Sequence, residues 1–350
     1  SEMCIRDSSY GDIVKALNEV QAGHVFQEFR DINELPEDSG RRVLTTGGHF
    51  GYLKIAEGCD KHCTYCIIPS LRGSFRSVPE ERLLAQAEYM ASQGVKELIL
   101  VAQETTVYGT DLYGRKTLHI LLKKLCQIRG IRWIRVLYCY PEEIYDELIQ
   151  VMKEEKKICN YLDLPIQHAS DRILKRMGRR TTRKQLTDII TKLRREIPDI
   201  VLRTSLITGF PGETQEDHEE LMEFVDEMEF DRLGVFTYSP EEGTPAESME
   251  GQVPEEVKEE RRDEIMSLQQ EISLEKGSER IGQELLVMIE GKVSGESAYI
   301  GRTYADAPKV DGYLFVQTGE LLVTGDFARV CVTGALEYDL IGELADEYTE

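Results

Sequence analysis

Three cysteines stand close together in the stretch EGCDKHCTYC, at Cys59, Cys63 and Cys66. Their C-x3-C-x2-C spacing lets three thiolates converge on one small centre, but no fourth cysteine follows nearby. A structural zinc site takes four ligands, whereas an iron–sulfur cluster on three thiolates keeps one iron for another ligand. Zinc completed by a distant residue, or three unrelated free cysteines, are the alternatives, and the spacing favours the cluster.

The other five cysteines do not extend this group. The first twenty residues lack the apolar segment of a secretory leader, so a disulfide framework is not expected. Clustered cysteines in such a chain indicate a metal or redox site. Four of the remaining cysteines fall on expected helices or strands, where they would pack as small apolar side chains: Cys126, Cys139, Cys159 and Cys331.

Strand-like and helix-like segments alternate from residue 51 onward, and they must position the cysteines. We expect strands at residues 51–56, 97–103, 133–140, 161–167, 201–210 and 232–239. Between them, apolar residues at helical spacing predict helices, among them 79–94, 117–130, 141–155 and 215–228. Such βα units predict parallel strands in a barrel or a doubly wound sheet. A complete barrel needs eight units, so we expect an open, partial (βα)6 barrel, with the cysteines on its active-site face.

The pattern changes after residue 250. A long polar segment predicts a connector helix, and the short alternating strands after it predict a small antiparallel β-barrel. The first 45 residues show only weak periodicity. We therefore divide the chain into an N-terminal segment (1–45), the partial barrel (46–250), the connector (251–282) and the small barrel (283–346).

Charge limits the choice of partners. The chain of 350 residues carries a formal net charge of −22, and residues 281–350 alone hold thirteen acidic against four basic residues. Nucleic-acid binders usually present a basic surface, so an acidic C-terminal segment favours a basic protein over RNA. No run of about 18 apolar residues predicts a membrane span, and we expect a cytoplasmic protein.

The cysteine motif, with Tyr65 just before its last cysteine, resembles the signature of the radical S-adenosylmethionine (SAM) enzymes. In that superfamily three cysteines hold a 4Fe-4S cluster, and SAM chelates the fourth iron. One-electron cleavage of SAM then gives a 5′-deoxyadenosyl radical that abstracts a hydrogen atom from the substrate. The resemblance thus implies Cys59, Cys63 and Cys66 as cluster ligands and assigns no catalytic role to a protein side chain.

The same resemblance implies cofactor contacts at strand ends and in a glycine-rich turn. These positions are Tyr65, Gln103, Glu104, Arg203, Gly209, Gly212 and Glu213. Arg203 would bind the SAM carboxylate, and the glycines would let the backbone approach the cofactor. Gln167 and His168, after the fourth expected strand, would face the substrate. Taken alone, Gln103 and Glu104 are equally compatible with an ordinary strand end. The glycine-rich turn alone favours an ordinary Gly-Pro turn, and His168 alone favours a structural histidine.

Further motifs make the resemblance narrower. GCDKHCTYCIIPSLRG, LPIQHASDRILKRMGR, YSPEEGTPA and the C-terminal GDFARVCVTGALEYDLIGEL together resemble RimO-type methylthiotransferases, with a TRAM-like C-terminal barrel. Such enzymes add a methylthio group to the β-carbon of an aspartate in ribosomal protein uS12 and use SAM as methyl donor and as radical source. The implied partners are the basic protein uS12 and an electron donor such as flavodoxin or ferredoxin.

Two other functions stay open at this point. MiaB-type tRNA methylthiotransferases share the signature, but the QHAS sequence at 167–170 resembles the ribosomal-protein branch, and the acidic C-terminal segment disfavours RNA. A non-catalytic ribosome-docking protein with a structural cluster is the second alternative. SAM turnover would distinguish it from an enzyme.

Methylthiotransferases also carry an N-terminal domain with three cysteines for a second 4Fe-4S cluster. Here only Cys4 precedes the motif. We interpret residues 1–45 as a remnant of that domain behind an unnatural leader at 1–8. The second cluster is then expected only in the full-length protein, and this chain is expected to be incomplete for full turnover.

Overall fold

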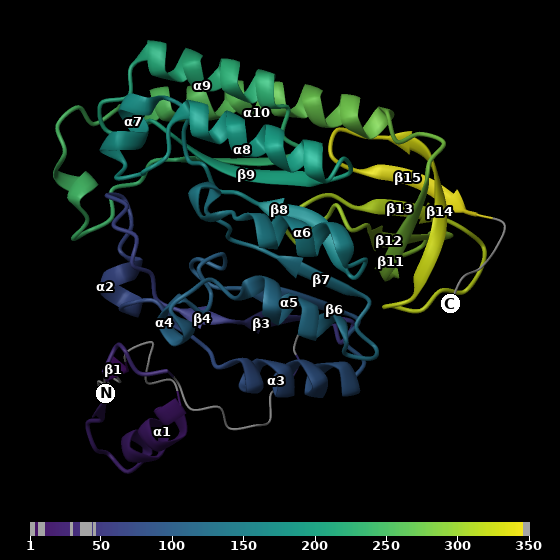
Figure 1. Cartoon of the computed structure of the whole chain (residues 1–350), viewed down its shortest axis with the longest axis horizontal. Coiled ribbons are helices and arrows are strands. Elements are labelled where there is room, and N and C mark those ends of the chain that lie inside the picture. The colour runs from purple at the N-terminus through teal and green to yellow at the C-terminus, as the bar shows by residue number, and fades with distance from the viewer. Residues whose placement is uncertain (1–3, 6–10, 29–30, 36–43, 45–46, 346–350) are drawn as a thin grey trace.

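A parallel sheet of six strands forms the centre of the molecule (Figure 1). The computed structural model describes residues 4–5, 11–28, 31–35, 44 and 47–345. The strand order is β10-β9-β8-β7-β6-β3, and every neighbouring pair is parallel. The strands are β3 (Phe50–Lys54), β6 (Glu97–Val101), β7 (Trp133–Val136), β8 (Ile158–Asp163), β9 (Val201–Thr208) and β10 (Arg232–Thr237). Each βα unit places its strand beside the strand of the previous unit. The strand order does not reverse, as it would in a doubly wound sheet, so the predicted partial barrel is confirmed.

Helices cover the outer face of this sheet (Figure 1). The longer ones are α3 (Glu80–Ser92), α5 (Leu118–Cys126), α6 (Asp146–Glu154), α8 (Arg183–Glu196) and α9 (Gln215–Met228). Their apolar stripes meet the sheet in the largest hydrophobic cluster, in which Leu83, Leu121 and Leu148 are completely buried. Full burial of such a side chain contributes about 1.5–3 kcal/mol. Thr182 and Thr214 begin α8 and α9 with capping boxes.

The helix α10 (Glu255–Ser278) is more than the connector that its polar sequence suggests. It packs along β10 and α9, and its Lys258, Arg261 and Gln269 are buried. Each of them has hydrogen-bond partners: Gln269 Nε2, for example, donates to the Phe230 carbonyl and to Ser273, although Gln269 Oε1 has none among the described residues. Buried polar side chains with partners are compatible with a core position, which the hydrophobic pattern of the sequence does not reveal.

A closed barrel of five strands follows α10. It consists of β11 (Glu284–Lys292), β12 (Ala298–Arg302), β13 (Leu314–Gln317), β14 (Phe327–Ala335) and β15 (Leu340–Leu344). The expected all-antiparallel pairing is wrong at one seam, because β13 and β15 pair in parallel. The long connection from 318 to 339 contains β14 and returns the chain to the same end of the barrel, which makes the parallel seam possible.

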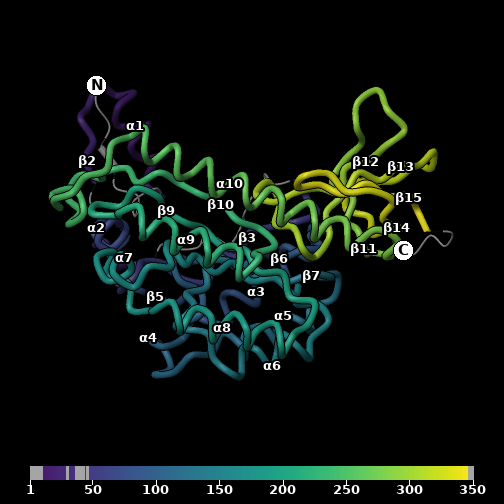
Figure 2. Tube along the Cα trace, turned by 90° about the horizontal axis from the view of Figure 1, so that it is seen from above, coloured from purple at the N-terminus to yellow at the C-terminus, as the bar shows by residue number. Residues whose placement is uncertain are grey.

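The C-terminal barrel lies at one end of the molecule, and α1 (Ile13–Gln21) lies toward the other (Figure 2). The expected N-terminal segment falls only partly on described residues, which add β1 (Cys4–Ile5) and β2 (Gln27–Glu28). Among the described residues, no helix is long and apolar enough to span a membrane.

The two units meet over a buried charge network. Glu97, at the start of β6, accepts hydrogen bonds from Arg135 of β7 (2.8 Å) and Arg302 of β12 (2.6 Å), and all three side chains are fully buried. Arg302 also binds Glu290 at 2.7 Å. Burial works to raise the pKa of Glu97, but the two guanidiniums outweigh it and hold that pKa below its usual range. The two arginines thus stabilise the ionised form of Glu97 in the core.

Among the described residues, removal of Arg302 would take one of two guanidiniums from the buried Glu97 and the only arginine from the partly buried Glu290. We expect Arg302→Ala to lower the free energy of unfolding by about 3–5 kcal/mol, measured as the urea midpoint followed by circular dichroism. The exposed pair Arg329–Glu284 gives the control, since Arg329→Ala is expected to cost less than about 0.5 kcal/mol. Equal midpoints for the two variants would contradict this role.

Candidate active site

The three cysteines lie in one loop beyond the carboxyl end of β3, between β4 (Ala56–Glu57) and α2 (Ile68–Arg72). All three are free thiols; Cys59 and Cys63 are buried and Cys66 is half-buried. Among the described residues, no three His, Cys, Asp or Glu side chains surround a single-ion position. Three thiols from one loop are the donor set of a cluster that keeps one iron open, whereas a structural zinc site takes four ligands.

Backbone contacts from three other segments hold this loop. The Cys59 amide donates to the Gly73 carbonyl (3.1 Å), and the Thr64 amide donates to the Met177 carbonyl (2.9 Å). Thr64 in turn accepts from the Ala246 amide (2.9 Å). Gly58 has φ +75°, and a Cβ there would lie 2.1 Å from the Ser74 carbonyl oxygen. The loop is thus fixed by backbone geometry on both sides of the cysteines.

Burial disfavours the thiolate form of Cys59 and Cys66. Burial raises the pKa of Cys59 to about 11, against a smaller opposing effect of the Lys61 amide. Burial also raises the pKa of Cys66. A bound metal cation reverses this balance, because a coordinating thiol is deprotonated. Metal binding and proton release at these cysteines are therefore coupled.

A cavity of about 490 Å³ lies inside the partial barrel next to this loop. Tyr65, Gln103 and Tyr140 line the end near the cysteines, and Ala307 and Val310 of the C-terminal barrel line it as well. Its volume is within the usual range of about 300–1,000 Å³ for small-molecule sites. Of the residues predicted from sequence, the structure brings Tyr65, Gln103, Gln167 and Arg203 together around this cavity.

Two residues near the loop carry buried polar atoms that make no hydrogen bond to described residues. Gln103 Oε1 and Glu104 Oε2 have no hydrogen-bond partner among the described residues. The other Glu104 oxygen accepts from the Thr106 amide (3.0 Å) and the Tyr140 amide (3.4 Å), which fixes the carboxylate. Burial raises the pKa of Glu104 to about 7, although Thr106 and Lys61 oppose the rise. This pair fits the amino group of SAM, which can donate several hydrogen bonds.

Arg203 is less available to a cofactor than its sequence position suggests. Its Nη1 donates to Asp163 (2.7 Å) and Ser205 (3.2 Å), and its Nε lies 3.4 Å from Asp311. The guanidinium is therefore already neutralised by two carboxylates. Arg203 therefore forms part of the cavity wall with its charge already paired, and its contact with the SAM carboxylate stays a prediction.

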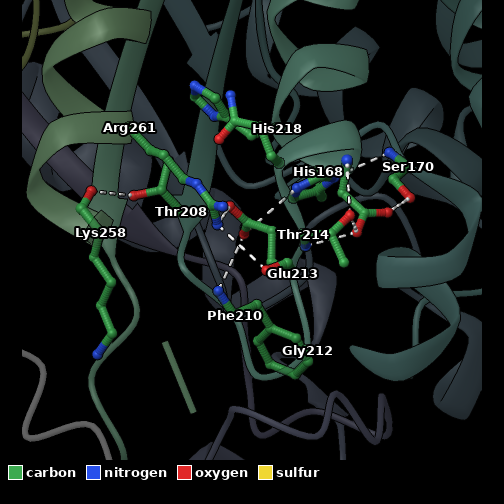
Figure 3. Close-up of polar contacts among 12 residues, drawn as sticks. His168, Ser170, Thr208, Phe210, Gly212, Glu213, Thr214, His218, Lys258 and Arg261 are labelled. Atoms are coloured by element: carbon green, nitrogen blue, oxygen red, sulfur yellow. Dashed lines mark hydrogen bonds and ion pairs between the residues drawn. The ribbon is translucent and has the colours of Figure 1, made fainter. Parts of the chain in front are cut away.

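His168 and Glu213 also differ from the prediction, because both are buried and neither lines the cavity. Figure 3 shows the polar contacts around them. His168 Nδ1 accepts the amides of Ala169 (3.0 Å) and Ser170 (2.9 Å), so its Nε2 carries the proton and faces Glu213 at 3.6 Å. Glu213 accepts from Arg261 (2.9 Å) and the Phe210 amide (3.1 Å). Burial opposes ionisation of Glu213, yet His168 and Arg261 hold its pKa below the usual range. In this structure the His168 side chain contacts Glu213 and the 169–170 backbone and does not line the cavity.

The network around His168 supports Gln167, which does line the cavity. Gln167 has φ +72°, a left-handed backbone that is uncommon outside glycine. Its amide donates to the Ser205 carbonyl (2.9 Å), and its carbonyl accepts from the Ile207 amide (2.8 Å). Strain of this kind concentrates at functional positions.

The two glycines of the turn serve packing inside the protein. A Cβ on Gly209 would lie 2.1 Å from Lys258 Cγ, and one on Gly212 would lie 3.0 Å from Arg176 Nε. Neither glycine lines the cavity. The expected backbone approach to a cofactor is therefore replaced by the approach of α7 (Asp171–Arg176) and α10 side chains.

Several cavity residues escaped the sequence reasoning. Tyr138 and Tyr140 follow β7, and Phe236 and Tyr238 lie on or just after β10. Tyr140 carries the Arg179 guanidinium over its ring at 4.3 Å, and its hydroxyl lies 3.7 Å from Cys63 Sγ. The run LYCY after the third strand was the available signal, since polar aromatics at strand ends often line active sites.

Comparisons with known proteins agree with this arrangement. The sequence matches the Radical SAM superfamily over residues 53–225 and the TRAM domain over residues 281–345. It is 61% identical over 335 residues to the ribosomal protein uS12 methylthiotransferase RimO of Lachnoclostridium phytofermentans, covering 96% of this chain and 76% of the relative. The RimO of Clostridium perfringens is 54% identical, with 89% and 69% covered.

The fold is also similar to that of a solved structure, coproporphyrinogen III oxidase (HemN) from Escherichia coli, described as a radical SAM enzyme. The TM-score is 0.50 at 15% identity, with 81% of this chain and 67% of that chain covered. At this identity the similarity concerns the fold alone.

The closeness of Gly58 to the 73–74 backbone gives a test of the cysteine loop. We expect Gly58→Ala to reduce iron bound after anaerobic reconstitution by at least about half, because the Cβ clash displaces Cys59. Gly94→Ala is the matched control: Gly94 also has positive φ (+94°) but open space around its Cβ position. It carries only the backbone penalty of about 1–2 kcal/mol, so full iron content is expected. Full loading of both variants would contradict a preorganised loop.

Proposed function

The chain belongs to the family of RimO ribosomal protein uS12 methylthiotransferases, and from this premise we propose that it adds a methylthio group to the β-carbon of an aspartate of uS12. The observation that carries the proposal is the fixed loop with three free cysteines beside a cavity with unpartnered polar atoms. The working units would be residues 46–250 and 283–346, joined by residues 251–282.

In this proposal Cys59, Cys63 and Cys66 hold a 4Fe-4S cluster with one iron open to SAM. When bound, cluster and SAM supply a carbon radical that can remove a hydrogen atom from an unactivated carbon. The chain's own residues bind and orient the cofactor: Glu104 Oε2 and Gln103 Oε1 accept hydrogen bonds from the amino group, while Tyr65 borders the site. Gln167 faces the substrate side of the cavity, while Tyr140 lies beside Cys63 at the cofactor end.

The substrate is a basic protein in this proposal. Two exposed aromatic side chains flank the cavity mouth, Tyr138 (47% exposed) and Phe236 (59% exposed). The following loop adds exposed Glu241 and Glu242. Apolar anchors beside acidic groups suit a basic polypeptide, whereas an acidic surface repels a phosphate backbone. uS12 is assembled into ribosomes, so we place the protein in the cytoplasm, with a soluble electron donor such as flavodoxin or ferredoxin.

Cofactor chemistry gives the first test of this function. Reconstituted under anaerobic conditions, the chain should bind about four iron atoms and, with a reductant, convert SAM to 5′-deoxyadenosine. Cys63→Ala should lose both properties, while Cys331→Ala, outside the loop, should keep them. A colourless protein with stoichiometric zinc, or a cluster-loaded protein that never cleaves SAM, would refute the enzymatic proposal.

The choice between protein and RNA gives the second test. We expect labelled uS12 to bind at least about tenfold tighter than bulk tRNA at equal ionic strength, with affinity that falls as salt is added. Glu241→Gln/Glu242→Gln should weaken uS12 binding several-fold. The control Glu271→Gln/Glu275→Gln removes the same charge from exposed positions on α10 and should have little effect. Tighter tRNA binding would favour the MiaB-type alternative.

A further inference from the structure

The connection between β12 and β13 leaves the C-terminal barrel and enters the partial barrel. Ala305 and Ala307 are buried there, in a hydrophobic cluster with Trp133, Tyr161 and Val201 of the parallel sheet. Trp133 and Val201 are the first residues of β7 and β9, at the strand ends away from the cysteine loop. Tyr161 lies on the inner face of β8. The connection therefore closes the end of the lumen opposite the cysteines.

This connection also lines the cavity. Ala307 and Val310 are among its lining residues; Ala307 is buried and Val310 is 53% exposed. Tyr161 and Arg203 line the same region. Arg203 is the third residue of β9, five residues before the strand ends at Thr208. At about 3.3 Å per residue, it lies deep below the edge that carries the cysteine loop.

Asp311 binds the connection to the end of the cavity opposite the cysteines, which we call the floor. Its carboxylate accepts hydrogen bonds from the Tyr161 hydroxyl (2.7 Å) and from the Ala307 amide (2.8 Å), and its Oδ1 lies 3.4 Å from Arg203 Nε. Asp163 of β8 binds the same guanidinium at 2.7 Å. One arginine is thus held by a carboxylate from each of the two units, and the Asp311 side chain is only 3% exposed.

The floor and the cofactor end of the cavity differ in chemistry. Unpartnered Gln103 and Glu104 atoms lie on the side of the cysteines, whereas the floor offers the apolar side chains of Ala307 and Val310 and an arginine that is already paired. A polar cofactor has its partners at the first end. The second end suits the side of a polypeptide that enters the lumen.

We propose that Ala307 and Val310 form the floor on which the substrate polypeptide rests, and that Asp311 is a positioning residue that holds this floor through Arg203 and Tyr161. Docking of the C-terminal barrel then completes the reaction cavity, and the barrel is part of the active site. This inference rests on the proposed function, since it takes uS12 as the polypeptide.

The test uses the full chain and a matched pair of tryptophan variants. Val310→Trp fills the floor, and Val323→Trp places the same side chain at a position that is 67% exposed and outside the cavity. We expect Val310→Trp to raise the dissociation constant for uS12 by about tenfold or more. Without uS12, its reductive cleavage of SAM should equal that of the unsubstituted chain. Val323→Trp should change neither quantity.

Asp311→Asn tests the positioning role. The asparagine is nearly the same size but weakens the pairing with Arg203, so uS12 binding should weaken several-fold while SAM cleavage without uS12 is retained. Equal uS12 affinity of Val310→Trp and Val323→Trp would overturn the inference and leave the proposed function intact. Loss of SAM cleavage in Val310→Trp would overturn it too, because the floor would then contact the cofactor. Failure of the unsubstituted chain to cleave SAM would instead refute the proposed function.

Discussion

The inner face of an open barrel of six strands must be shielded from water while space for a cavity remains inside the barrel. The rest of this structure depends on the segment that shields this face. A full barrel closes its lumen with side chains from eight strands. Here the lumen is closed from one end by residues 303–311 of the second unit. Because only that end is covered, space remains beneath the cysteine loop.

Closing the lumen in this way brings charges into the core. Arg135, Arg203, Arg232 and Arg302 each meet at least one carboxylate, from Glu97, Asp163, Asp306, Asp311 or Glu290. An uncompensated buried charge costs several kcal/mol, while a fully paired one is close to neutral. The network therefore adds little to stability by itself, but it penalises any other docking of the two units. We regard its main contribution as specificity of assembly.

The sequence was most informative where local patterns decide the structure. The cysteine spacing, the alternation of strands and helices, and the strand ends at Gln103 and Gln167 all depend on short stretches of chain, and each led to residues at one cavity or beside it. It was least informative where the partner of a residue is remote. The resemblance implies a cofactor contact for Arg203, but its pairing with Asp311, which lies 108 positions later in another unit, cannot be seen in the sequence. The close approach of Lys258 to Gly209 and of Arg176 to Gly212 likewise cannot be seen in the glycine-rich turn itself. The parallel β13–β15 seam likewise depends on the route of a whole connection.

The two ends of the cavity are formed in different ways. Rigid backbone forms the end at the cysteine loop, and the docked second unit forms the opposite end. The cysteine loop has its geometry set by Gly58, Thr64 and the amides around them, so little ordering is left to cofactor binding. The floor, in contrast, exists only when the second unit is docked. A substrate that contacts both ends must meet both conditions at once.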